Sequence, residues 1–287
     1  TCALPIFCAA SALFAVDNYY YTIGDDGTLL QVLHPNKNDF ILKNDFSKKV
    51  SPDKVFMPAK IGVDGNITSL GKNAEANGKN SLAFGNSAKT TNENSIAFGS
   101  NSKTTGANSI AFGQGASAQE NTISIGKGAS ASKDTIVIGN GSYAHLGQSE
   151  NSVVIGHNTG VGFENTVAIG SDIKSGSANT ILLGYGTNIG DQAENSTVLG
   201  AKSSVGTFSK NSIAFGYEAS VAQSAGNSTV VGVGAKAQKS GSTAIGYQAE
   251  SSGRHSVALG YGVKTLGDSS VAIGHESQTI GPDTIAI

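Results

Sequence analysis

Histidine and serine are the residues of this chain that could support hydrolysis, because an imidazole beside a hydroxyl can activate it as a nucleophile. The five histidines are His34, His145, His157, His255 and His275. None has a spacing that pairs it with a carboxylate, and serine recurs at one fixed place in a repeated phrase, which is typical of a structural role. We therefore expect no enzymatic site, and we expect the last four histidines to lie solvated at corners of the fold.

Two glycine-flanked stretches could hold a phosphate, because a glycine-rich loop lets backbone N–H groups surround an anion. They are Gly126-Lys127-Gly128 and Gly184-Tyr185-Gly186. Neither opens a helix and no Gly-x-x-x-x-Gly-Lys-Ser/Thr motif is present, so we interpret both as corners. The Gly-Gly-x-Gly-x-Asp repeat of calcium-binding rolls is also absent, and the histidine spacing does not favour a metal site. The sequence predicts no metal and no cofactor.

Tyrosine or histidine directly follows a recurrent glycine in six places. These residues are His157, Tyr185, Tyr217, Tyr247, Tyr261 and His275. At a corner they would form an exposed column along one edge, and tyrosine offers a large contact area at a low entropic cost. One interpretation is a contact strip for a partner, and the other, which we favour, is packing of each corner onto the next coil. The six residues are the candidate binding residues of the chain.

The elements that carry these residues are set by a repeat. The phrase Asn94-Ser-Ile-Ala-Phe-Gly99 returns, barely altered, to the end of the chain. Its closing glycines are Gly71, Gly85, Gly99, Gly113, Gly126, Gly139, Gly156, Gly170, Gly184, Gly200, Gly216, Gly232, Gly246, Gly260 and Gly274. Successive copies lie 13 to 17 residues apart, and 14 is the commonest spacing. A short fixed period predicts a solenoid in which each coil stacks on its neighbours.

Alternation within the phrase predicts a strand. The residues three and one before the glycine, such as Ile96 and Phe98, are large, and alternate residues of a strand share a face. The alanine between them and the Ser or Thr four before the glycine make the other face small. A second strand follows, with small residues three and five after the glycine, such as Ser102 and Thr104. We expect the large residues to fill the interior and the small ones to line the outside.

The length of the coil limits its shape. Fourteen residues at about 3.3 Å each reach about 46 Å, which is enough for two short strands and two corners, so a flattened, two-sided roll is predicted. Asn five before the glycine and the glycine itself mark the corners, since both tolerate a positive φ. Stacking at about 4.8 Å predicts Asn and Ser/Thr ladders and a rod of about 70 Å. Insertions around residues 141–148 and in the coils closing at Gly200, Gly216 and Gly232 should bulge from an edge, where recognition is easily placed.

Composition supports this all-β prediction. The 287 residues include 38 Gly and no Trp, and only 14% are charged. Such a composition also suits disorder, but Val, Ile and Phe at fixed offsets supply the apolar burial that disordered chains lack. The formal net charge is −2 and the basic residues are scattered, so we expect no nucleic-acid or anionic-membrane partner.

The chain divides into three segments. Residues 1–15 hold a short apolar run that we interpret as a possible signal-peptide remnant, and both cysteines, Cys2 and Cys8, lie in it. Residues 16–65 do not repeat and are expected to cap the solenoid. Within them, Asp25-Asp-Gly27 and Asp64-Gly65 predict hairpin turns rather than a calcium loop. Residues 66–287 form the repeat body.

The stretch Asn94-Ser-Ile-Ala-Phe-Gly-Ser-Asn-Ser102 and its copies at 108–116 and 256–263 closely resemble the Asn-Ser-Val-Ala-Ile-Gly-x-x-Ser repeat of YadA-like heads in trimeric autotransporter adhesins. The resemblance covers residues 66–287. It implies a left-handed parallel β-roll and a homotrimer on the outer membrane of a Gram-negative bacterium. The family's neck, stalk and C-terminal membrane anchor have no counterpart here, so attachment to a membrane is an expectation taken from the family.

Trimerisation is also expected on physical grounds, because each thin coil buries only about four inward side chains. We expect the small-residue wall, or the wall of the second strand, to pack against sister chains. The expected function is a surface adhesin head that binds host extracellular matrix or cells by avidity, without a small-molecule substrate. A phage tail-fibre segment is the first alternative. An ice-binding solenoid is the second, although the outward partner of Ser/Thr is predicted to be Ala rather than a second Thr.

Overall fold

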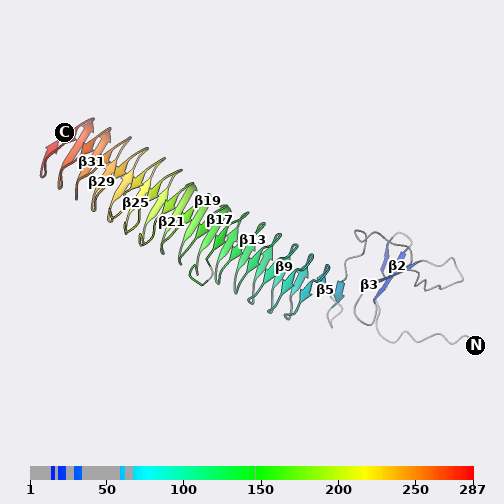
Figure 1. The fold of residues 1–287 in the computed structure, drawn as a ribbon. Helices are drawn as coiled ribbons and strands as arrows, with labels where there is room; N and C mark the ends of the chain where they lie inside the picture. Colours follow the sequence, from blue (N-terminus) through cyan, green and yellow to red (C-terminus); the bar gives the residue numbers. More distant parts are fainter. Residues whose placement is uncertain (1–13, 17–18, 24–28, 34–58, 62–66, 146) are drawn as a thin grey trace, which may run out of the picture.

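The computed structural model describes residues 14–16, 19–23, 29–33, 59–61, 67–145 and 147–287, and every regular element within these ranges is a β-strand. From residue 67 onward the chain winds into coils that stack along one axis, and Figure 1 shows the resulting rod. The predicted all-β solenoid of about 14-residue coils is confirmed. Residues 1–13 of the proposed signal remnant, and most of the 16–65 segment, lie outside the described residues.

One strand of every coil joins a long parallel sheet, which we call the front sheet. Its strands are β5 (Ile67–Leu70), β7 (Leu82–Phe84), β9 (Ile96–Phe98), β11 (Ile110–Phe112), β13 (Ile123–Ile125), β15 (Ile136–Ile138), β17 (Val153–His157), β19 (Val167–Ser171), β21 (Ile181–Tyr185), β23 (Thr197–Leu199), β25 (Ile213–Phe215), β27 (Thr229–Val231), β29 (Thr243–Ile245), β31 (Val257–Tyr261), β33 (Val271–His275) and β35 (Ile285–Ala286). Neighbouring strands pair in register, so that Ala97 lies beside Ala111 and Phe98 beside Phe112. Most of these strands end at the residue before the recurrent glycine, and β17, β19, β21, β31 and β33 continue one residue past it.

The second strand of every coil is only two residues long and joins a parallel sheet that we call the back sheet. Its strands are β6 (Glu75–Ala76), β8 (Lys89–Thr90), β10 (Lys103–Thr104), β12 (Ser117–Ala118), β14 (Ser130–Ala131), β16 (Tyr143–Ala144), β18 (Gly160–Val161), β20 (Lys174–Ser175), β22 (Asn188–Ile189), β24 (Ser204–Val205), β26 (Ser220–Val221), β28 (Lys236–Ala237), β30 (Glu250–Ser251), β32 (Lys264–Thr265) and β34 (Gln278–Thr279). The order follows the chain from β6 to β34. The coil is therefore two-sided, with one sheet on each side.

Antiparallel pairing is confined, within the described residues, to the N-terminal part of the chain. Strand β2 (Tyr19–Ile23) pairs with β1 (Phe14–Val16) and β3 (Leu29–Leu33), and Ile23 faces Leu29. Strand β4 (Ala59–Ile61) pairs with β5 at the first coil. The chain thus reverses direction where Asp25-Asp-Gly27 and Asp64-Gly65 predict hairpins, although these turn residues lie outside the described residues.

Both corners of the coil use the residues that the sequence assigned to them. Asn94 has φ 53°, and its amide Nδ2 donates to Oδ1 of Asn108 at 3.2 Å, which confirms the predicted Asn ladder. Gly99 has φ 130°, and a Cβ built on it would lie 2.5 Å from the carbonyl oxygen of Gly113. Glycine is required there for two reasons, the backbone conformation and the close approach of the next coil.

The faces of the front strand are reversed relative to the sequence prediction. Ala97 is fully buried, whereas Ile96 on one side of it and Phe98 on the other are 37% and 36% exposed. The same holds along the rod: the middle residue of each front strand points inward, and its large neighbours point out. The prediction that the Ile, Leu, Val and Phe columns fill the interior is therefore wrong, and the small wall proposed as a contact for sister chains is the core itself.

The physical reason is the narrow space between the two sheets. Four side chains per coil point inward, for example Ser95, Ala97, Ser102 and Thr104. The largest inward residues are Ile173, Leu182 and Ile189, which lie in coils of 14 and 16 residues. No aromatic side chain is buried among the residues whose exposure the structure describes. Among these residues the interior holds side chains no larger than Leu or Ile, so the phenyl rings of the front strands must face outward.

Many buried serine hydroxyls of the interior are satisfied by the corners, whereas those of Thr90 and Thr104 on the back strands have no hydrogen-bond partner. The Oγ of Ser109 donates to the carbonyl oxygen of Gly106 at 2.7 Å, and the Oγ of Ser102 donates to that of Gly99 at 2.8 Å. These bonds remove most of the cost of burying a polar group. The predicted Ser/Thr ladder exists, but it faces the core rather than water.

We predict that Gly99→Ala lowers the free energy of unfolding by about 2 kcal/mol or more, because alanine adds backbone strain and meets the carbonyl of the next coil. Gly115→Asn is the matched control, since Gly115 has φ 68° with no atom within 4 Å of a built Cβ, and Asn101 holds the same place one coil earlier. Urea denaturation followed by circular dichroism measures both. Equal midpoints for the two variants would contradict the packing described for the glycine column.

Candidate interaction surfaces

The outward side chains of the front sheet form a continuous apolar surface, which we call the apolar wall. Its most exposed aliphatic and phenyl members are Ile96, Phe98, Phe112, Ile136, Ile169, Ile181, Leu183, Ile213, Phe215 and Leu259. Because the strands pair in register, these residues lie in columns, and the rings of Phe84, Phe98 and Phe112 stack at centroid distances of 4.7 Å. Monomeric soluble proteins rarely expose apolar patches of this extent, so the wall indicates an interaction surface.

The six candidate binding residues lie on the same side of the rod as the apolar wall. Four of the six are the last residues of front strands: His157, Tyr185, Tyr261 and His275. Each comes two residues after an outward Ile or Leu and therefore lies on the same face of the sheet. Tyr185 is 54% exposed, and the other five are exposed as well. The predicted exposed column is therefore present, but Ser171, Ala201 and Val233 interrupt it.

Packing onto the next coil, the interpretation that the sequence favoured, holds for part of this column. The rings of Tyr247 and Tyr261 stack at 5.0 Å, and Tyr261 stacks on His275 at 5.0 Å with an interplanar angle of 3°. Tyr217 instead accepts a hydrogen bond from Lys202 at 3.3 Å, and the Tyr217 hydroxyl raises the pKa of that lysine. The column widens the apolar wall in the C-terminal half of the rod while its polar edges stay in water.

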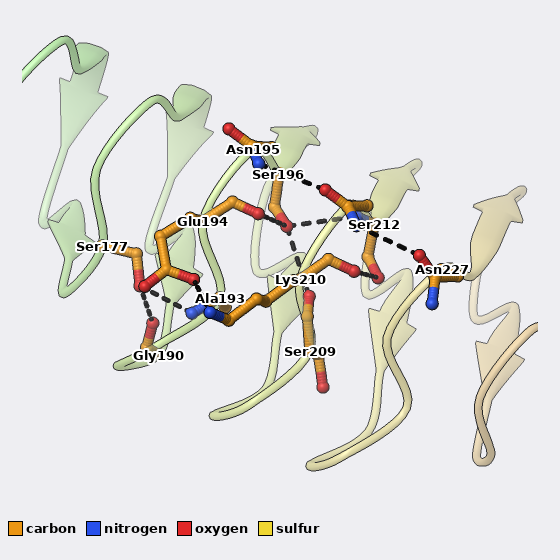
Figure 2. Close-up of polar contacts among 11 residues, drawn as sticks. Ser177, Gly190, Ala193, Glu194, Asn195, Ser196, Ser209, Lys210, Ser212 and Asn227 are labelled. Atoms are coloured by element: carbon orange, nitrogen blue, oxygen red, sulfur yellow. Dashed lines mark hydrogen bonds and ion pairs between the residues drawn. The ribbon is translucent and has the colours of Figure 1, made fainter.

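The predicted insertions form enlarged corners, and a polar network fixes three of them (Figure 2). Ser177 donates to the carbonyl oxygen of Gly190 at 2.7 Å and accepts from the backbone N–H of Ala193 at 2.8 Å. Ser209 makes the same pair of bonds two coils later, to Ala222 at 2.7 Å and from Ala225 at 3.0 Å. The repeated motif shows that the longer corners are built structures with their own buried serine.

An ion pair joins two of these corners. Lys210 Nζ lies 3.0 Å from Glu194 Oε2, and the two residues flank the Asn195–Asn211 step of the Asn ladder (Figure 2). A hydrogen bond from its own backbone N–H and the Lys210 ammonium hold the pKa of Glu194 below its ordinary value. Both side chains are partly exposed, so the pair contributes only about 0.5 kcal/mol.

In the described part of the chain, no cluster of side chains is arranged for catalysis or for metal binding. His145, His157, His255 and His275 are all exposed, as expected, and they lie on separate coils; His34 is outside the described residues. No three His, Cys, Asp or Glu residues gather closely enough to hold a metal ion within the described ranges. The stretches 126–128 and 184–186 are corners with positive φ at both glycines. No helix long and apolar enough to cross a bilayer occurs among the described residues.

Comparison with known families agrees with this geometry. The family model described as the YadA head domain repeat matches residues 68–88, 91–116, 148–172, 192–219, 224–249, 237–262 and 266–287, which together make up more than half of the chain. The chain belongs to the YadA head family. No curated protein matches the chain significantly. The heads of this family are surface-exposed parts of bacterial trimeric autotransporter adhesins, so this YadA head is of the adhesin type, and its family and fold are typical of structural adhesins.

In this YadA head, the matched repeats place one front and one back strand in each coil, and several matches begin or end within a coil. The residues that sequence reasoning missed are those of the apolar wall, which it assigned to the core. The signal that could have found them is the shortness of the coil, since fourteen residues leave no interior wide enough for stacked phenyl rings.

We predict that Lys210→Met raises the pKa of Glu194 but not fully to its ordinary value, because the backbone N–H of Glu194 also stabilises the carboxylate. A lowered folded-state pKa means that the contribution to stability, about 0.5 kcal/mol, is complete above the unfolded pKa near 4.5 and is lost as the pH falls through the folded value. NMR titration of the Glu194 carboxyl carbon measures the shift. Lys239→Met, which removes the partner of Asp268 instead, is the control and should leave Glu194 unchanged.

Proposed function

We propose that this YadA head is the exposed adhesive part of a bacterial surface protein, and that it works as a homotrimer that attaches the cell to host extracellular matrix or host cells. The apolar wall is the single observation that carries the proposal. It runs along the front sheet from coil to coil, and it requires a partner surface of equal length and the same repeat. A second and third copy of this chain, aligned in parallel, supply such a surface.

The energetics favour such an assembly. Covering the exposed part of a half-exposed Ile, Leu or Phe side chain contributes about 1 kcal/mol. Each coil presents about two such side chains, so fifteen coils supply roughly 30 kcal/mol per chain, which exceeds the 4 to 15 kcal/mol estimated for association. Packing through the wall also leaves the polar back sheet in water, where a ligand can reach it.

The candidate column of His157, Tyr185, Tyr217, Tyr247, Tyr261 and His275 has a proposed role in this assembly. Because it borders the apolar wall, it would lie at the rim of the contact between chains, where the tyrosine hydroxyls keep access to water. We propose that it contributes to the homotrimer contact first, and that host ligands meet it only where it leaves the interface. This proposed role of the column is separate from any binding of a ligand to the back sheet.

The ice-binding alternative loses its main support. That interpretation requires threonines paired on a flat outer face, whereas the repeated hydroxyls, including Thr90 and Thr104, are buried between the sheets. Attachment to the outer membrane through a C-terminal anchor remains part of the proposal, taken from the family rather than from any residue described here.

We predict that the unsubstituted chain has three times the 29.0 kDa mass of the single chain in light scattering. Phe98→Lys with Phe215→Lys should give the monomer, because each change would place three buried charges together at the interface. Ser117→Lys with Ser220→Lys puts the same charges on the back sheet and should leave the trimer intact. A monomeric unsubstituted chain, or dissociation by both double variants, would rule out the wall as the interface.

We predict that the trimer binds surfaces coated with collagen, fibronectin or laminin, and that the Phe98→Lys/Phe215→Lys variant binds the same surface at least about 100-fold more weakly per chain, because avidity is lost. Surface plasmon resonance at matched chain concentration measures this. The adhesin proposal fails if the trimer binds neither these proteins nor cultured cells. It also fails if the monomer binds as tightly as the trimer.

A further inference from the structure

The back sheet contains one stretch where its outward side chains are missing. In most coils two outward columns carry side chains, as in Lys89 and Thr91 or Lys103 and Thr105. In the middle of the rod, glycine replaces one or both of these outward residues in four successive coils, whose back strands pair with one another. The glycines are Gly160 in the first column and Gly162, Gly176, Gly190 and Gly206 in the second. The bare backbone floors a groove of about 320 Å³.

An aromatic ring forms one end of the floor. Tyr143 pairs with Gly160, and a Cβ built on Gly160 would lie 2.5 Å from Cε1 and 2.7 Å from the hydroxyl of Tyr143. The ring therefore lies along the backbone of Gly160, which only glycine permits. Its other face remains open, since the side chain is 45% exposed. A flat aromatic ring held in this way is a platform for the apolar face of a ligand.

Polar side chains of the next coils complete the groove. Lys174 and Asn188 continue the Tyr143 column, and His145 begins the glycine column. The carboxylate of Asp191 lies over Gly176, and the hydroxyl of Thr207 lies 2.7 Å from a Cβ built on Gly190. Lys174 and Asp191 make no ion pair in the described part of the chain, so the ammonium and the carboxylate are both free to bind a ligand.

The enlarged corners lie around this groove. The coil that carries Tyr143 and His145 closes 17 residues after the previous one, and the coils that carry Asp191 and Thr207 are 16 residues long. The corner with Asp191 is fixed by the two hydrogen bonds of Ser177 (Figure 2). The groove therefore has longer corners at its sides, and the part of its floor that carries Gly160, Gly162 and Gly176 lies on the two 14-residue coils between them.

We propose that this groove binds a neutral sugar unit of a glycan. One positive and one negative side chain leave the groove without net charge, which favours a polyhydroxylated ligand over a polyanion. The Tyr143 ring would pack against the C–H face of the sugar, while the amide of Asn188, the carboxylate of Asp191 and the ammonium of Lys174 would bond its hydroxyls. The site lies on the face opposite the apolar wall, so in the proposed trimer it would be present three times and open to water.

Saturation-transfer NMR on the full chain tests this site with the methyl glycosides of galactose, glucose, N-acetylglucosamine and N-acetylneuraminic acid at millimolar concentration. At least one neutral glycoside should bind. Tyr143→Ala and Gly162→Gln should each weaken that binding roughly tenfold, by removing the platform and by filling the floor. Leu266→Ala and Ser252→Gln remove a large outward side chain and add one elsewhere on the back sheet, and they should leave the affinity unchanged, with circular dichroism confirming the fold of all four variants.

The proposal is overturned if no neutral glycoside binds, if only N-acetylneuraminic acid binds, or if the control variants weaken binding as much as the groove variants. The role of the site as a contact for host cells rests on the proposed adhesin function, but the measurement does not. A chain that forms trimers and adheres to matrix without binding a sugar would overturn the groove alone. Sugar binding by a chain that fails to adhere would leave the groove in place and overturn the adhesin proposal.

Discussion

The distance between the two sheets governs the rest of this structure. A coil of about fourteen residues closes around a space that holds four inward side chains, and these are mostly Ala, Ser, Thr or Val, with Ile173, Leu182 and Ile189 as the largest. So thin an interior gives each coil little apolar burial of its own. Stability must then come from in-register stacking, from corner residues that fit one conformation, and from whatever covers the outside of the front sheet.

Two features of the surface follow from this limit. Because the core takes small residues, the bulky members of the repeat lie outside, where like residues stack into columns such as Phe84, Phe98 and Phe112. Because strict repetition makes a uniform wall, variation is left to the corners and to the outward positions of the back sheet. The groove beside Tyr143 combines both kinds of variation, with longer corners at its sides and glycines in its floor.

Much of the fold could be predicted from the sequence because it depends on spacing and backbone conformation. The period, the strand ends just before residues such as Gly99, and the Asn corners follow from Gly and Asn, which tolerate backbone conformations that other residues rarely adopt. The enlarged coils follow from the longer spacing between the recurrent glycines. The direction of the side chains could not be read in the same way. Alternation shows that Ile96 and Phe98 share a face, but it does not say which face is inside. The usual rule that large apolar residues are buried gave the wrong answer, since it ignores the width of the coil. The groove was missed because only the recurrent glycines that close each coil were considered, whereas Gly162 and Gly176 lie at outward positions directly after back strands.

The direction of the backbone hydrogen bonds determines how such a rod responds to force. In both sheets these bonds join one coil to the next, as between the N–H of Lys103 and the carbonyl of Ala116 at 2.8 Å, so they lie along the long axis while the covalent chain winds across it. Tension between a bacterium and its substrate would therefore act on the non-covalent links, and a strained end would peel away turn by turn. In the proposed trimer, side-by-side copies would share this load, so assembly would also raise the resistance of the rod to force.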